Sequence, residues 1–158
     1  MARKTGGEER TAALQRLKAA LKTGDMGNFY VFFGEEAFLK EHYWRMLEKK
    51  LLDGPAAEFN FHRFETLSPQ ALSEAVDAMP MMAERTLIRV DDVDFFKQAE
   101  GAREQYRMIF ADLPEYCCLV LYYDTAEWKP NGTMRKLNEV FQTKCERVEF
   151  GKQTERDL

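Results

Sequence analysis

The sequence has few of the residues that usually carry metal or redox chemistry. It contains two histidines, His42 and His62, and three cysteines, Cys117, Cys118 and Cys145. Neither histidine has cysteines or carboxylates around it at metal-ligand spacing, so we expect both to be structural. An odd number of cysteines without paired spacing indicates free thiols in a reducing compartment. Cys117 and Cys118 lie inside an apolar run, where we expect them to be buried.

Long apolar runs and an excess of positive charge are also missing. No stretch approaches the roughly 18 apolar residues of a membrane span, and the opening MARKTGGEER lacks the apolar segment of a secretory signal. We therefore expect a cytoplasmic protein without a membrane partner. The formal net charge is -4, and the sequence contains no basic stripe of the kind that holds nucleic acid. This absence counts against direct binding of nucleic acid.

The chain does have the apolar content of a packed core. Its 158 residues are 45% hydrophobic and include 12 phenylalanines, which suits a single domain. The spacing of the apolar residues predicts helices over 11–22, 36–52, 68–79, 100–111 and 133–142, and strands over 29–33, 58–64, 86–90, 117–123 and 145–150. Such alternation implies right-handed crossovers and a parallel sheet. The expected fold is α/β, a five-stranded parallel sheet with flanking helices in a three-layer sandwich.

Two of the predicted helices have an apolar stripe that we expect to face the core. In the helix over 68–79, Ser68 is the expected N-cap and Pro69 the first helical residue. Pro80 ends that helix, because the residue before a proline is pushed out of the helical region. The apolar stripes are Phe38, Leu39, Tyr43, Met46, Leu47 and Leu51 in the helix over 36–52, and Leu72, Ala75, Val76 and Met79 in the helix over 68–79. In the strand over 58–64, the alternating residues are Phe59, Phe61 and, after a slip, Phe64.

The stretch VFFGEEAFLKEH (31–42) has the outline of a phosphate-binding loop. A P-loop reads G-x-x-x-x-G-K-[ST]; here Gly34 and Lys40 match, whereas Leu39 replaces the second glycine and Glu41 the hydroxyl residue. Leu39 puts a side chain where the backbone must approach a phosphate, and two acids follow Gly34. We interpret the stretch as a degenerate P-loop that binds no nucleotide, with Lys40 facing solvent. The alternative is an active P-loop ATPase or nucleotide sensor, which would depend on Lys40.

The run LIRVDD (87–92) resembles the strand and acidic residue that hold Mg²⁺ in P-loop ATPases. Without a competent phosphate loop, a metal there has no nucleotide to bridge, so we expect Asp91, Asp92 and Asp94 to form a solvated loop. The sequence contains no G-x-S-x-G motif. We assign no catalytic residue and expect no cofactor.

The segment AMPMMAER (78–85) places Met79, Met81 and Met82 within four residues. Because Pro80 interrupts the helix, Met81 and Met82 are expected at or just past its end. Two large flexible side chains are difficult to bury together on a short turn, and methionine is typical of adaptable binding surfaces. The turn is therefore a candidate protein-binding site. The alternative is that both methionines pack into the core of a generic α/β scaffold.

The segments YVFFGEEAFLKEHYWRML, EFNFHRFE and LSEAVDAMPMMAERTLIRVDDVDFF, in this order, resemble the delta subunit of bacterial DNA polymerase III over about Phe29 to Phe150. The resemblance implies an AAA+-type fold that has lost its nucleotide site. It also implies that the chain binds the ring-shaped sliding clamp (beta) and helps to open it for loading onto primed DNA. Two large apolar residues make that contact in the family; here they fall on Met81 and Met82, beside Met79 and Pro80. ATP would be bound by other loader subunits (delta-prime, tau/gamma), and this chain would be a non-catalytic part of the polymerase holoenzyme.

The end of the sequence adds an expectation about domain organisation. The letters TERD (154–157) match the [ST]-x-x-[DE] capping box that opens a helix, and only Leu158 follows. We expect a single N-terminal domain, with a helix and linker over 1–25, a core over 26–151 and the start of a next, truncated domain over 152–158. The later helical domains of the family, including the collar, have no counterpart in this sequence.

Overall fold

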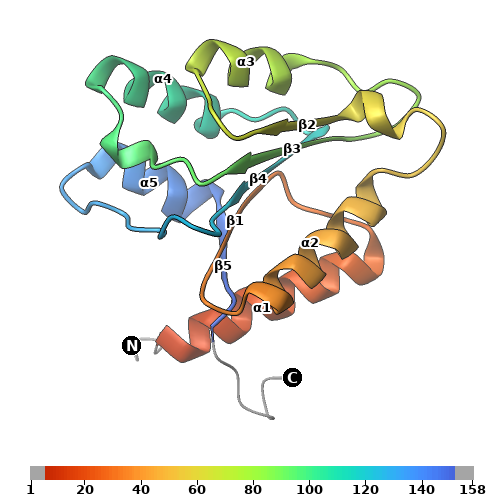
Figure 1. Ribbon diagram of the computed structural model, residues 1–158, viewed down its shortest axis with the longest axis horizontal. Helices are drawn as coiled ribbons and strands as arrows, with labels where there is room; N and C mark the ends of the chain where they lie inside the picture. Colours follow the sequence, from red (N-terminus) through yellow and green to blue (C-terminus); the bar gives the residue numbers. More distant parts are fainter. Residues whose placement is uncertain (1–5, 152–158) are drawn as a thin grey trace.

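The computed structural model describes the backbone of residues 6–151 and the side chains of residues 11–151; the capping box over 154–157 lies outside this range. The chain folds into a sheet covered by helices (Figure 1). Its elements are α1 (Gly6–Thr23), β1 (Phe29–Phe33), α2 (Ala37–Leu51), η1 (Ala57–Asn60), β2 (Phe61–Phe64), α3 (Pro69–Asp77), β3 (Thr86–Asp91), η2 (Phe95–Lys97), α4 (Glu100–Ala111), β4 (Cys117–Tyr122), α5 (Arg135–Lys144) and β5 (Glu146–Glu149), where η marks a 3₁₀ helix.

The strands form one sheet in the order β2-β3-β4-β1-β5, and every neighbouring pair is parallel. Strand β1 lies between β4 and β5, so that Val31 pairs with Leu121 on one side and Arg147 on the other. All six residues of β4 are buried, including Cys117 and Cys118, as a parallel strand covered on both faces requires. The prediction of a five-stranded parallel sheet is confirmed.

Helices cover both faces of the sheet, with α3, α4 and α5 on one face and α1 and α2 on the other (Figure 1). Successive strand residues point to opposite faces, so Val31 lies in the cluster under α3–α5 and Phe32 in the cluster under α1 and α2. Leu17 of α1 is fully buried in the second cluster. Burial of these two apolar clusters makes the molecule a three-layer sandwich. Within the described residues, no helix is long and apolar enough to cross a membrane.

Helix α3 begins as predicted and ends two residues early. The Ser68 hydroxyl accepts a hydrogen bond from the backbone N–H of Ala71 (3.1 Å), and Pro69 is the first helical residue. The helix stops at Asp77 because Ala78 is already extended, at φ -64° and ψ 121°. The prediction that Met79 continues the buried stripe is therefore wrong, and this side chain is exposed. The stripe itself, Leu72, Ala75 and Val76, is buried as expected.

The predicted strand over 58–64 is only half a strand. Residues 57–60 form the 3₁₀ helix η1, and β2 begins at Phe61. The reason is Asn60, whose side chain is buried and bonds the backbone of Ala56 and of Met81. Such bonds from a side-chain amide compete with a strand ladder. Phe59, one of the alternating phenylalanines on which the strand prediction depended, lies in η1 and is exposed.

Helix α2 is rotated relative to the predicted apolar stripe. Its buried residues are Lys40, Trp44, Leu47 and Leu51, whereas Phe38 and Met46 are exposed. The pattern failed because it assigned the charged Lys40 to solvent and so shifted the buried face toward Phe38. The burial of Lys40 follows from specific partners, described below.

Candidate functional site

The turn after β1 is closed by the chain's own backbone. Gly34 has φ +117°, and a Cβ there would lie 2.6 Å from the Phe150 carbonyl oxygen, so only glycine fits. The backbone N–H of Glu36 donates to the same carbonyl at 2.8 Å. In a P-loop, such N–H groups surround phosphate oxygens. Here the N–H of Glu36 donates to the Phe150 carbonyl instead, so it is not available to a phosphate.

Lys40 is buried where a P-loop lysine would reach a nucleotide. Its side chain is 2% exposed, so the prediction that Lys40 faces solvent is wrong. The ammonium donates to the carbonyl oxygens of Gly34 (3.0 Å) and Tyr123 (2.6 Å) and lies 5.5 Å from the Tyr122 ring. Burial lowers the pKa of Lys40. Two of its three donors thus connect the β1–α2 turn to the end of β4.

The two neighbours of Lys40 in the motif are also engaged within the protein. Leu39 packs against the cluster under α1 and α2, and the Glu41 carboxylate accepts a hydrogen bond from the Tyr122 hydroxyl (3.0 Å).

The aspartates after β3 are engaged within the protein, which corrects the expected solvated loop. Asp91 is the last residue of β3; it is buried and accepts from Arg63 and Arg89, each at 2.8 Å. Asp92 accepts from the backbone N–H groups of three residues of the β4–α5 loop, 124–126. Burial opposes the charge of Asp92, but these hydrogen bonds outweigh it and lower its pKa.

Asp94 caps η2 by accepting from the N–H of Phe96 at 3.0 Å. With Asp91 and Asp92 engaged as well, all three carboxylates have partners within the protein. Within the described part of the chain, no group of three or more histidine, cysteine, aspartate or glutamate residues could hold a metal ion.

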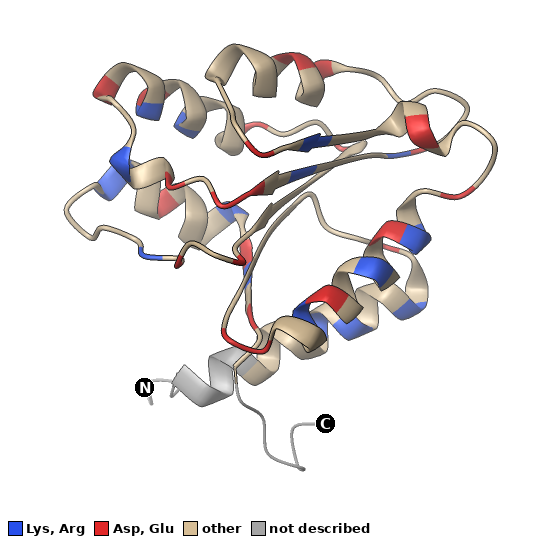
Figure 2. Ribbon diagram, in the orientation of Figure 1, with Lys and Arg blue, Asp and Glu red and all other residues tan. Residues whose placement is uncertain are grey.

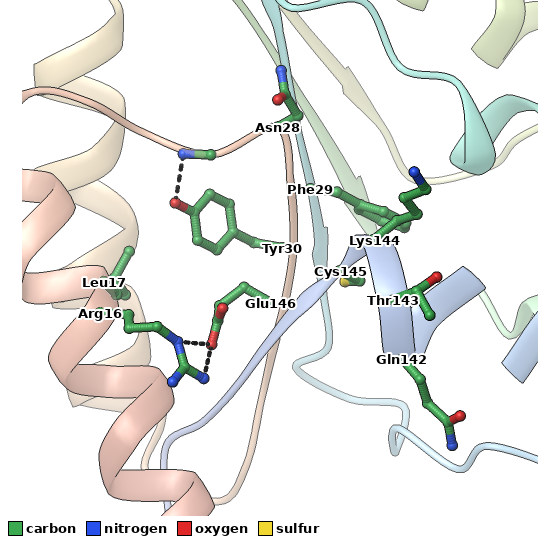
Figure 3. Close-up of a pocket in the computed structure, with 11 residues that line it drawn as sticks. Arg16, Leu17, Asn28, Phe29, Tyr30, Gln142, Thr143, Lys144, Cys145 and Glu146 are labelled. Atoms are coloured by element: carbon green, nitrogen blue, oxygen red, sulfur yellow. Dashed lines mark hydrogen bonds and ion pairs between the residues drawn. The ribbon is translucent and has the colours of Figure 1, made fainter. Parts of the chain in front are cut away.

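A polar cavity of about 340 Å³ lies between α1 and the start of β5 (Figure 3). On one wall, Arg16 donates to Glu146 at 2.9 Å; on another, the Tyr30 hydroxyl accepts from the N–H of Gly27 at 2.8 Å. Burial raises the pKa of Tyr30 to about 12 and raises that of the neighbouring Cys145 well above its ordinary value. Both shifts favour the protonated, uncharged forms of Tyr30 and Cys145, so neither side chain is an activated nucleophile.

The turn between α3 and β3 exposes three methionines at one corner of the molecule. The side chains of Met79, Met81 and Met82 are 78%, 53% and 83% exposed. They do not pack under β3, as a generic scaffold would require. Met82 has φ +54°, a conformation that a bulky side chain rarely adopts and that marks strain held by its surroundings. The Met turn, residues 78–85, is therefore a surface feature with a constrained backbone.

Asn60 fixes the centre of the Met turn. Its side chain is 1% exposed; its Oδ1 accepts from the N–H of Met81 at 2.6 Å, and its Nδ2 donates to the Met81 carbonyl at 2.8 Å. Both backbone groups of one turn residue are thus held by one buried amide. Our sequence reasoning missed this residue. The available signal was an asparagine inside a phenylalanine-rich run, because asparagine is depleted in strands.

Both ends of the Met turn are anchored as well. At the start, the Tyr116 hydroxyl donates to the Asp77 carbonyl at 3.0 Å. At the end, the Arg85 guanidinium donates to the carbonyl oxygens of Met26 (2.8 Å), Gly27 (2.9 Å) and Tyr116 (3.1 Å). Arg85 thereby connects the turn to two other loops at the same edge of the sheet. The exposed methionines sit on a backbone that is held at three points.

The comparisons identify the family. A family model described as DNA polymerase III, delta subunit, matches residues 30–146, which include the turn after β1 and the Met turn. The chain belongs to this delta-subunit family. None of the curated proteins matches the sequence.

Two solved structures are similar to this delta-family domain in fold. The Bacillus subtilis DNA clamp loader delta protein superimposes with a TM-score of 0.74 at 17% identity, over 91% of this chain and 44% of that chain. A gamma subunit-related protein of DNA polymerase III from Thermotoga maritima gives 0.59 at 13% identity, over 89% of this chain and 47% of that one. This chain therefore spans less than half of either solved chain. The expected AAA+-like α/β fold is confirmed.

Charge in the delta-family domain is unevenly distributed between its layers (Figure 2). Residues 11–23 of α1 together with α2 carry seven lysines and arginines and two acids. Residues 57–60 and 74–85, around the Met turn, carry four acids and one base, and that base is the engaged Arg85. The corner that exposes the methionines is thus apolar with an acidic surround, which disfavours phosphate groups and suits a protein surface.

Proposed function

We propose that this delta-family chain binds the sliding clamp of DNA polymerase III through Met81 and Met82, with Met79 and Pro80 beside them. The observation that supports the proposal most directly is the exposure of both methionines on an anchored turn. A pair of exposed apolar side chains gains about 25 cal/mol for each Å² that it buries against a partner. Association and side-chain ordering offset part of this gain. Because the backbone is already fixed, less ordering remains at binding.

Binding at this turn would help to open the clamp for loading onto primed DNA. A ligand shifts a conformational equilibrium only by its differential affinity for the two states. The Met pair would therefore favour the open ring only if it binds that form better than the closed ring. The free energy would come from binding, because the proposal assigns this chain no nucleotide hydrolysis.

The proposal also assigns the remaining steps to other chains. Other clamp-loader subunits, delta-prime and tau/gamma, would bind ATP and assemble with the full-length protein in the cytoplasm. DNA would be reached only through the assembled loader, consistent with the acidic surround of the Met turn.

The test is the affinity of the chain for the sliding clamp of the same organism. We expect Met81→Ala combined with Met82→Ala to raise the Kd at least tenfold, because both central apolar contacts are removed. Met108→Ala is the matched control, since Met108 is also exposed but lies on α4; its Kd should stay within about twofold of the wild-type value. Isothermal titration calorimetry measures all three. An unchanged Kd for the double variant would exclude this site.

A further inference from the structure

Large exposed apolar side chains are concentrated at one corner of the described structure. The seven such residues are Phe38, Met46, Phe59, Met79, Met81, Met82 and Met108. Three of these lie on α2 and α4, and the other four lie on η1 and the Met turn. Single exposed apolar residues are ordinary, whereas a contiguous group marks an interaction surface. The fourth member of this group, Phe59, has no role in the site as described so far.

Phe59 is held next to the Met turn by its neighbour. Asn60 binds the N–H and the carbonyl of Met81 at 2.6 and 2.8 Å, so η1 and the turn lie side by side, at the right of Figure 1. The N–H of Phe59 donates to the Ala56 carbonyl at 3.0 Å, which fixes the backbone of η1. Within the described residues, Phe59 belongs to neither hydrophobic cluster. Its ring is 60% exposed on a backbone tied directly to Met81.

We propose that Phe59 is a third apolar contact with the sliding clamp, so that η1 and the Met turn form one binding surface. The inference rests on the proposed function, and it names the clamp as the single occupant because η1, which carries Phe59, is hydrogen-bonded directly to Met81. The clamp would present an apolar site for the Met pair and an apolar ledge beside it for the ring of Phe59.

The chemistry of the four side chains suits this division. Methionine has three rotatable bonds and adapts to an irregular pocket, but it loses rotamer freedom when it is bound. A phenylalanine side chain has only two rotatable bonds. It therefore buries a large area at a lower entropic cost than methionine does, as aromatic anchors of interfaces do. Phe59 would thus add rigid contact area to a flexible pair. It would also fix the rotation of the domain about the Met turn, because two separate contacts define an orientation that one cannot.

The test compares clamp affinity among the full 158-residue chain and three variants by calorimetry. Phe59→Ala removes the proposed contact, and Phe59→Leu keeps an apolar side chain. Phe38→Ala is the matched control, because it makes the same chemical change at an exposed site on α2. We expect Phe59→Ala to raise the Kd roughly 5- to 30-fold and Phe38→Ala to leave it within about twofold. Phe59→Leu should fall between them, and all melting temperatures should stay near the wild-type value.

The outcomes separate this inference from the proposed function. If the Met81→Ala, Met82→Ala double variant loses affinity while Phe59→Ala does not, the inference is overturned and the proposed function stands. If the double variant keeps its affinity, both are overturned. If Phe38→Ala weakens binding as much as Phe59→Ala does, the effect is not specific to this corner and the inference is overturned.

Discussion

Lys40 holds together two segments that a nucleotide would bridge in an active P-loop protein. Its ammonium contacts the carbonyls of Gly34 and Tyr123, at the ends of β1 and β4. A lysine that binds phosphate must be free to reach it, and this one is buried and engaged. Lys40 therefore matches the lysine of the P-loop motif in the sequence, but in the fold it has a structural role.

Replacing Lys40 should destabilise the protein. Lys40→Met keeps most of the side-chain volume but leaves the carbonyls of Gly34 and Tyr123 without their donor. The bond to the Tyr123 carbonyl is buried and the bond to the Gly34 carbonyl is partly buried. Because one unsatisfied buried carbonyl costs about 1–3 kcal/mol, we expect the free energy of unfolding to fall by at least that amount. Urea denaturation followed by circular dichroism measures it. Lys18→Met, an exchange at a partly exposed position on α1, is the control; equal losses in both variants would contradict the structural role of Lys40.

At the scale of elements, η1 and α3 matter because they fix the two sides of the Met turn. The sequence pattern predicts α3 well, since its N-cap, its first-turn proline and its buried stripe are all local signals. It fails at η1, because the bonds between Asn60 and Met81 join residues 21 positions apart. No periodicity of side chains contains that information. The same limit explains the missed anchors Arg85 and Tyr116.

Removing the side chain that joins η1 to the turn should weaken clamp binding through the turn. Asn60→Ala removes both hydrogen bonds to the Met81 backbone, so the free turn samples more conformations. It then loses more conformational entropy when it is ordered by binding. We expect the Kd to rise about 5- to 10-fold and the unfolding free energy to fall by about 1–3 kcal/mol. In a background that already carries Met81→Ala and Met82→Ala, Asn60→Ala should have little further effect on the Kd. Full additivity in this cycle would contradict a positioning role.

At the scale of the whole molecule, alternation along the sequence is enough to predict a parallel three-layer sandwich, but not its strand order. The order β2-β3-β4-β1-β5 depends on which strands pair over long distances in the chain. The overall composition also does not predict the charge distribution. The net charge is -4, but basic residues are in excess over α1 and α2 and acidic residues are in excess around the Met turn. Averages along the chain cannot resolve properties that arise when distant segments meet.

The engaged groups around the turn after β1 predict how the stability of the whole molecule responds to nucleotide. A ligand that binds only the folded state raises the stability of the protein, so a working nucleotide site would be detected as a stability gain. At 100 times its Kd, a nucleotide would stabilise the fold by about 2.7 kcal/mol. The N–H of Glu36 already donates to the Phe150 carbonyl, and the Lys40 ammonium already donates to the Gly34 carbonyl. Because these donors are not available to a phosphate, we expect millimolar Mg·ATP to leave the melting temperature unchanged in a thermal-shift assay. Clamp affinity should likewise be the same with and without Mg·ATP. A saturable rise in melting temperature that disappears in Lys40→Ala would instead establish a working nucleotide site, and with it the alternative of a nucleotide sensor.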